Sequence, residues 1–155
     1  MIVEDAESFA AALPRAGALI GLDPGTKTIG VAVSDGLRSV ASPLETVKRT
    51  KFGANAERIL ALGADRAAVG IVVGLPRNMD GTEGPRAQAA RGFARNLERV
   101  TELPIAFWDE RLSTVAAERA LLEADTSRAK RAERIDSVAA SYILQGMLDR
   151  LRHIG

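Results

Sequence analysis

The amino-acid sequence predicts an α/β fold in which a mixed sheet of five strands carries helices on both faces. Three extended segments come first, between residues 18 and 48, and strands and helices alternate after them. The later strands are short runs rich in apolar residues, which is typical of strands buried on both sides. A chain of 155 residues without an internal repeat is long enough for one such domain.

The first three strands are predicted to be antiparallel. Residues 18–23 and 29–34 are apolar segments joined by a short Pro-Gly turn, so they are expected to pair as a hairpin. The third segment, 39–48, contains Pro43. Because proline cannot donate a hydrogen bond to a neighbouring strand, this segment is expected to lie at an edge of the sheet or to be irregular.

Helices and strands alternate in the middle of the chain. Apolar residues at helical spacing predict a helix between residues 53 and 63, and a second helix is predicted over 85–101. Strands are predicted over 67–75, a run rich in valine and isoleucine, and over 105–109. Strands that alternate with helices are usually parallel, which makes the predicted sheet a mixed one.

The C-terminal part of the chain is predicted to be helical. Ser113 is expected to cap a helix that runs to about residue 123, and a final helix is predicted over 134–151. Residues 125–133, between these two helices, are polar and basic and show no apolar periodicity. The predicted order is therefore three strands, two helix–strand pairs and two final helices.

Composition limits the class of protein. The chain contains no cysteine, which excludes disulfides and thiolate zinc sites. Its N-terminus does not resemble a signal peptide, and no apolar run approaches the ~20 residues that span a bilayer. We therefore expect a cytoplasmic protein with no membrane partner.

The net charge is +1, so nucleic-acid binding would depend on a local basic patch. We expect residues 1–16 to be an N-terminal extension and residues 17–155 to form the functional domain.

Three carboxylates stand at positions where an α/β fold collects its functional groups. Asp23 ends the first strand, and Glu110 follows the strand over 105–109. Functional residues gather at the carboxyl ends of parallel strands, so these two groups would meet if their strands were parallel neighbours. Asp136 lies in the first turn of the final helix, on the helix face that also carries Ile143.

Each of these carboxylates also has a simpler explanation. Asp23 precedes a Pro-Gly turn that an aspartate stabilises. Asp136 is favoured by the helix dipole, and Glu110 could form an ion pair with Arg111. Together, however, three converging carboxylates repel one another unless a cation lies among them.

Oxygen ligands of this kind favour Mg²⁺ or Mn²⁺. Zinc is disfavoured, because the chain contains one histidine, His153, and no cysteine. A carboxylate site with one or two such ions is the usual apparatus for hydrolysing a phosphodiester bond, since the metals activate water and stabilise the entering and leaving oxygens. The three carboxylates therefore predict a metal-dependent nuclease.

Four segments, in this order, resemble one known family: "IGLDPGTKTIGVAVSD", "VVGLPRNMDGTEG", "WDERLSTVAAE" and "RIDSVAASYIL". They are similar to the YqgF (RuvX-type) family of pre-16S rRNA nucleases, and the resemblance runs from about residue 18 to about residue 150. It implies a ribonuclease H-like fold, related to bacterial Holliday-junction resolvases, and a metal-dependent nuclease that trims the 5′ end of pre-16S rRNA in ribosome biogenesis. It also implies that Asp23, Glu110 and Asp136 form the acidic, metal-binding triad.

The candidate substrate-binding residues are basic or amide side chains near these carboxylates. They are Lys27, Arg77, Asn78, Arg111, Arg128, Lys130 and Arg131. One departure from the family concerns Thr28, which stands where many members carry a basic residue, so that Lys27 becomes the nearer cation. Alternatively, the basic run is a solvated segment, and the loop around Asn78 is a plain turn. Arg111 could either brace Glu110 or contact substrate.

Other functions remain open at this point. The same chemistry could act on branched DNA, as in a Holliday-junction resolvase, which would require a symmetric dimer. We leave open whether the chain is a monomer or a homodimer. A non-catalytic factor that binds rRNA of the small-subunit precursor would not need the triad. An ATPase of the actin type is disfavoured, because that fold needs two such domains and this chain has the length of one.

Overall fold

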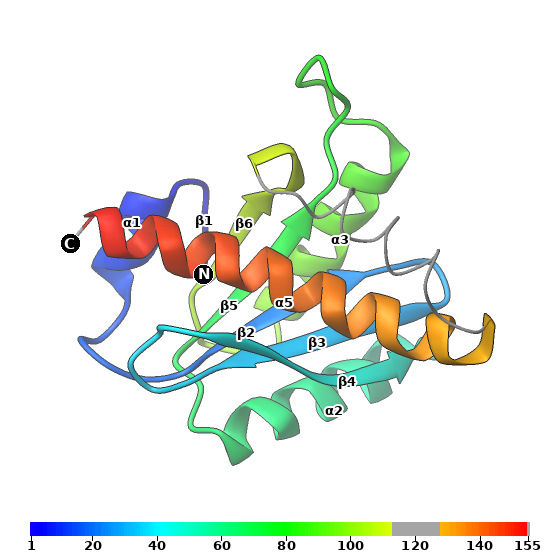
Figure 1. Cartoon of the computed structure of the whole chain (residues 1–155), viewed down its shortest axis with the longest axis horizontal. Helices are drawn as coiled ribbons and strands as arrows, with labels where there is room; N and C mark the ends of the chain where they lie inside the picture. The colour runs from blue at the N-terminus through cyan, green and yellow to red at the C-terminus, as the bar shows by residue number, and fades with distance from the viewer. Residues whose placement is uncertain (113–127, 155) are drawn as a thin grey trace.

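The computed structural model describes residues 1–112 and 128–154, and in the second range it describes side chains from Asp136 on. Within these residues, six strands form one mixed sheet with helices on both faces (Figure 1). The elements are β1 (Ile2–Val3), α1 (Ala6–Ala12), β2 (Leu19–Pro24), β3 (Thr28–Ser34), β4 (Ala41–Lys48), α2 (Phe52–Asp65), β5 (Gly70–Leu75), α3 (Pro85–Glu98), β6 (Ile105–Asp109), the 3₁₀ turn η1 (Glu110–Leu112) and α5 (Arg128–Ile154). None of the described helices is long and apolar enough to cross a membrane.

The strand order is β1-β6-β5-β2-β3-β4. β2, β3 and β4 are antiparallel, as predicted, and β4 is an edge strand whose register shifts near Pro43. β5 pairs in parallel with both β2 and β6. The strands that end in Asp23 and Asp109 are therefore parallel but not neighbours, because β5 lies between them.

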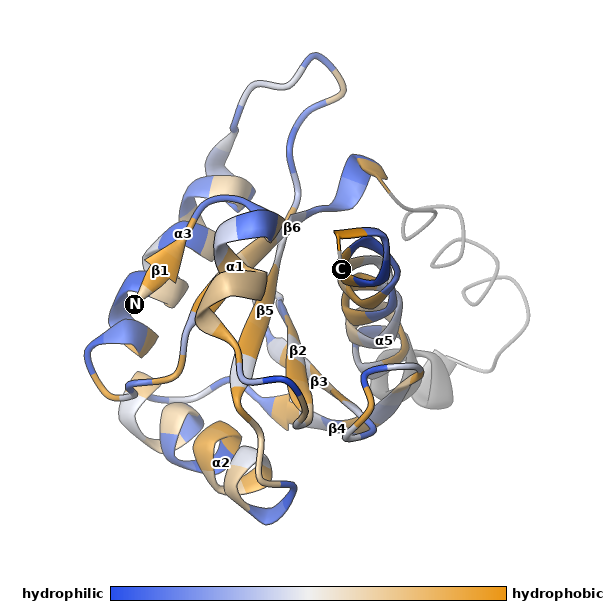
Figure 2. Ribbon diagram, turned by 90° about the vertical axis from the view of Figure 1, so that its left-hand side faces the viewer, coloured by the Kyte–Doolittle hydropathy of each residue, from blue (hydrophilic) through white to orange (hydrophobic). Residues whose placement is uncertain are grey.

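The side chains of the sheet alternate between two apolar cores. On one face Ile20 and Leu22 pack with residues of α2 and α3. On the other face Leu19 packs with residues of α1 and α5. Figure 2 shows the apolar sides of these helices turned toward the sheet. Because alternate residues of a strand share a face, Asp23 lies on the α5 face, two positions after Gly21, whose added Cβ would lie 2.7 Å from Leu144 Cβ.

The prediction of five strands was one too few. The additional strand, β1, comes from the N-terminal segment and pairs in parallel with β6, where Ile2 is opposite Ile105. The amide of Ile105 also donates a hydrogen bond to the carbonyl oxygen of Met1, at 2.8 Å. A strand of two residues has no periodicity that sequence reasoning could recognise, because alternation needs about four residues.

Other boundaries also differ from the predictions, by one to six residues, and α3 ends at Glu98 rather than at residue 101. β5 begins at Gly70 rather than at residue 67, because Ala67, with a φ of 51°, belongs to the turn that precedes the strand. The final helix begins at Arg128 rather than at residue 134, so the last part of the basic segment is helical. The helix predicted over 113–123 lies outside the described residues.

Candidate active site

Asp23 is a buried carboxylate between two glycines. It lies at the end of β2 and is only 4% exposed. Its partner on β3 is Gly30. On β5, Val73 is opposite Leu22, so the next position in register beside Asp23 is Gly74. The sheet therefore carries no side chain on either side of Asp23 on the α5 face.

The two glycines make room for the other predicted carboxylates. A Cβ at Gly30 would collide with the backbone carbonyl of Asp136 on α5. A Cβ at Gly74 would lie 3.1 Å from Oε2 of Glu110 and 2.5 Å from Cδ1 of Ile143. Glu110 and Asp136 thus approach the same face of the sheet from opposite sides of Asp23.

Asp136 is also held from β3. The hydroxyl of Thr28 donates a hydrogen bond to Oδ2 of Asp136, across 108 positions of sequence. Thr28 is the residue that departs from the family pattern, and its side chain is directed to a predicted triad residue. In this chain, the hydroxyl of Thr28 orients the carboxylate of Asp136. A basic residue at position 28 would instead neutralise the charge of that carboxylate.

The donor atoms fit a hard divalent ion in kind. All three groups supply carboxylate oxygens, the ligands that Mg²⁺ and Mn²⁺ prefer. Among the described residues, however, no three His, Cys, Asp or Glu side chains are arranged closely enough to hold a metal ion. The three carboxylates share one face and one edge of the sheet without forming a closed ligand set.

Arg77 and Arg111 both bind Asp109, the last residue of β6. Arg111 Nη2 lies 2.7 Å from Asp109 Oδ2, and Arg77 Nη1 lies 3.7 Å from the same oxygen. The hydrogen bonds from Arg111 hold the pKa of Asp109 below its usual value. Arg111 therefore braces Asp109 and not Glu110, and both arginines are already paired within the protein.

This contact belongs to a chain of ion pairs that fixes the loop after β5. Arg77 also pairs with Glu83, at 3.4 Å, and Glu83 accepts from Arg91 of α3, at 2.6 Å. Asn78 lies in the same loop, where its side-chain amide donates to Thr82 Oγ1 at 2.9 Å. Ion pairs and a hydrogen bond between its own polar side chains and their neighbours therefore hold this loop at the carboxyl ends of the strands.

A shallow pocket of about 420 Å³ lies beside Asp136. It is lined by the β2–β3 turn, which includes Lys27, and by Arg86 at the start of α3. Lys27 is exposed at this site. Arg86 was not identified from the sequence, because it is separated from every triad residue and only the fold brings it to Asp136.

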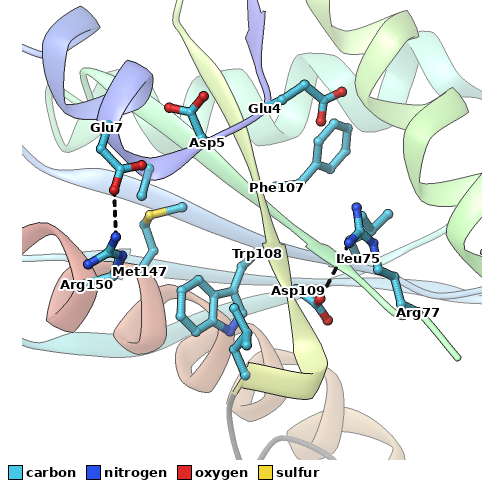
Figure 3. Close-up of a pocket in the computed structure, with 12 residues that line it drawn as sticks. Glu4, Asp5, Glu7, Leu75, Arg77, Phe107, Trp108, Asp109, Met147 and Arg150 are labelled. Atoms are coloured by element: carbon cyan, nitrogen blue, oxygen red, sulfur yellow. Dashed lines mark hydrogen bonds and ion pairs between the residues drawn. The ribbon is translucent and has the colours of Figure 1, made fainter. Parts of the chain in front are cut away.

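A second pocket lies on the other side of β6 and is mainly acidic (Figure 3). Its volume is about 260 Å³, and its lining includes Glu4, Asp5 and Glu7 from the N-terminal segment. Its cations are paired, since Arg150 contacts Glu7 at 2.6 Å and Arg77 contacts Asp109. This charge distribution disfavours a phosphate. The side chains of Arg128, Lys130 and Arg131 lie outside the described part of the chain.

Comparison with known proteins identifies the family. A family model described as "RuvX: Holliday junction resolvase" matches residues 17–150. The chain belongs to the RuvX family. A relative from Paracoccus denitrificans is 73% identical over all of this chain and 98% of its own length. Relatives from Cereibacter sphaeroides, strain ATCC 17025, and Rhodobacter capsulatus are 70% and 64% identical, each over all of this chain and 97% and 98% of their own lengths. All three are named "Putative pre-16S rRNA nuclease".

The RuvX chain also resembles solved structures in fold. RuvC of Thermus thermophilus in complex with a Holliday junction substrate superposes with a TM-score of 0.56 at 16% identity, over 88% of this chain and 96% of that chain. Another T. thermophilus RuvC structure gives a TM-score of 0.53 over 87% and 96%, also at 16% identity. The predicted family and the predicted ribonuclease H-like fold are confirmed. The prediction of a nuclease is confirmed by the family and by its relatives.

Proposed function

We propose that this RuvX chain is a divalent-metal-dependent nuclease that processes the 5′ end of pre-16S rRNA. The observation that carries the proposal is that Glu110 and the backbone of Asp136 approach the sheet at Gly74 and Gly30, the two positions on either side of Asp23. The names of the closely similar relatives support pre-16S rRNA as the substrate. An RNA of this kind would make the cytoplasm the place of action.

In this proposal Asp23, Glu110 and Asp136 hold Mg²⁺ or Mn²⁺. The chemistry that such ions supply when bound is activation of water and stabilisation of the entering and leaving oxygens. Asp23 is the fixed ligand, because its strand is buried. Glu110 and Asp136 are only partly buried, so rotation of their side chains can complete the ligand set. Thr28 orients Asp136 from β3.

The remaining residues have supporting roles. Residues 17–155 are proposed to contain the nuclease domain, and residues 1–16 complete its sheet with β1 and cover it with α1. Asp109, held by Arg77 and Arg111, keeps Glu110 in place because the two acidic residues are consecutive. Asn78 stabilises the loop that carries Arg77. We propose that Arg128, Lys130 and Arg131 contribute phosphate contacts next to Asp136.

The test is a cleavage assay on an RNA that contains the 5′ leader of pre-16S rRNA. We expect the wild-type protein to cleave it with Mn²⁺ or Mg²⁺ and not in EDTA. Asp136→Asn is expected to lower the rate by roughly 10²- to 10³-fold, as expected for loss of a group that stabilises transition-state charge. The matched control is Asp149→Asn, an exposed acid on the same helix that pairs with Arg152. Equal cleavage by the two variants would reject the triad.

The description of the family model favours a second candidate, cleavage of branched DNA. A resolvase of a two-fold junction needs a symmetric dimer. A four-way DNA junction in the same assay, together with the molar mass in solution, distinguishes the two. If a dimer cleaved the junction in preference to the leader RNA, branched DNA would be the substrate instead of RNA. A non-catalytic rRNA-binding factor predicts instead that function survives the loss of all three carboxylates.

A further inference from the structure

The pocket beside Asp136 differs in charge from its surroundings. The arginines around the loop after β5, which are Arg77, Arg91 and Arg111, are all in ion pairs with carboxylates of the protein. Lys27 and Arg86, which line this pocket, are exposed and form no side-chain ion pair or hydrogen bond with other described residues. The carboxylate of Asp136 lines the same pocket, so its charged side chains are two cations and one anion. This excess of positive charge favours the binding of an anion.

The two cations are carried on elements that are tied together. The amide of Gly25 donates to the carbonyl of Thr28 at 2.9 Å, which closes the turn that carries Lys27. Arg49 donates from Nη1 to the carbonyl of Gly25 at 2.5 Å. Its guanidinium also lies 5.5 Å from the centre of the Phe93 ring on α3, the helix that begins beside Arg86. Arg49 therefore links the turn to this helix, and the pocket is formed before any ligand binds.

We propose that Lys27 and Arg86 bind one backbone phosphate of the RNA, next to the phosphodiester that is cleaved. The inference rests on the proposed function, and it adds a specific position for the substrate strand. The pocket contains Asp136, so a phosphate between the two cations belongs to a nucleotide close to the metal ligands. The strand then leaves the site across the β2–β3 turn and the first turn of α3. It does not pass over Arg77 and Arg111, which Asp109 already neutralises.

Binding, measured separately from cleavage, tests this proposal. The leader RNA is titrated in EDTA against Asp23→Asn, a background that leaves the RNA intact, at several salt concentrations. We expect Arg86→Gln to weaken binding severalfold at low salt. We expect the double variant, Lys27→Gln with Arg86→Gln, to reduce the slope of log affinity against log salt by about 0.7, the value for one single-strand phosphate contact. Arg95→Gln is the matched control. Arg95 is exposed at the other end of α3, about 13 Å along the helix axis.

A double variant tests whether the two cations bind the same phosphate. If they do, Lys27→Gln combined with Arg86→Gln loses less binding free energy than the sum of the single changes. Additive losses, an affinity of Arg86→Gln equal to that of Arg95→Gln, or an unchanged salt slope in the double variant would overturn the proposal. The binding measurement can be interpreted whether or not the protein cleaves RNA. A wild-type protein that binds the leader but does not cleave it with Mn²⁺ would contradict the proposed nuclease function. The binding data would still decide whether Lys27 and Arg86 contact a phosphate.

Discussion

At the scale of single residues, Asp109 is a carboxylate next to the candidate site that pairs with two arginines. It accepts from Arg111 and pairs with Arg77, and it directly precedes Glu110. A residue that orients a metal ligand does not itself contact the substrate. Its loss commonly lowers metal affinity or activity by about 10- to 100-fold.

We therefore predict that Asp109→Asn lowers cleavage within that range and raises the Mn²⁺ concentration that gives half of the maximal rate. The control is Asp80→Asn, which removes an acid that caps the exposed turn at Thr82. The measurement is a Mn²⁺ titration of the initial cleavage rate. An unchanged midpoint for Asp109→Asn would show that Asp109 does not position Glu110.

The same residue gives a prediction about pH. Hydrogen bonds from Arg111 lower the pKa of Asp109 in the folded protein. A carboxyl whose pKa is lower in the folded state stabilises the fold above the unfolded-state pKa of about 3.8, and this contribution is lost as pH falls through the folded-state value. The difference in free energy of unfolding between wild type and Asp109→Asn should therefore be constant near neutral pH and shrink below pH 3.8. Urea unfolding across this range measures it, and a difference that grows in acid would reverse the assignment.

At the scale of elements, the approach of α5 to the sheet depends on glycines. Gly30 permits the backbone of α5 to lie against β3 at Asp136, where even a methyl group would collide with a carbonyl. The backbone of a helix cannot move aside as the end of a flexible side chain can. A methyl group at position 30 would therefore force α5 to shift away from β3.

We predict that Gly30→Ala destabilises the protein and abolishes cleavage, because the shift separates Asp136 from Asp23. Gly53→Ala is the matched control, since a Cβ at Gly53 on α2 meets nothing within 4 Å. Alanine is about 0.5–1 kcal/mol better than glycine inside a helix, so the control should be neutral or slightly stabilising. Thermal unfolding of both variants decides this, and a stable, active Gly30→Ala protein would contradict the described helix position.

At the scale of the whole molecule, the N-terminal segment is integrated into the fold. β1 extends the sheet beyond β6, and Phe9 of α1 is fully buried in the core shared with α5. Phe9→Ala is expected to lower the free energy of unfolding by about 3–5 kcal/mol, because it leaves a cavity in a packed core. Val40→Ala, at a residue that is 59% exposed, should change it by no more than about 0.5 kcal/mol. Urea unfolding provides the comparison, and a similar small effect at both sites would place Phe9 outside the core.

The sequence was informative where a physical pattern is local. The apolar strands and the Pro-Gly turn predicted the antiparallel start of the sheet, and Pro43 predicted the irregular edge strand. Asp23 and Glu110 were proposed as site residues because strand ends are visible in the sequence. That both lie on the α5 face rests on the structure.

Other features depend on contacts between distant segments, which no local pattern reveals. The pairing of Arg111 with Asp109 and not with Glu110 depends on side-chain direction after β6. The position of β5 between β2 and β6 is a matter of topology. Arg86 lines the pocket beside Asp136 only because α3 starts near the β2–β3 turn. The contact of Thr28 with Asp136 joins residues 108 positions apart.

That last contact has a consequence for protein synthesis. Asp23 and Glu110 are made before α5, the helix that carries Asp136. Chains fold from the N-terminus as they are made. With the proposed triad, an unfinished chain on the ribosome lacks one of its three metal ligands and the partner of Thr28. By this proposal the site would therefore be able to bind its metal and cleave RNA only after α5 has been made and has packed on the sheet.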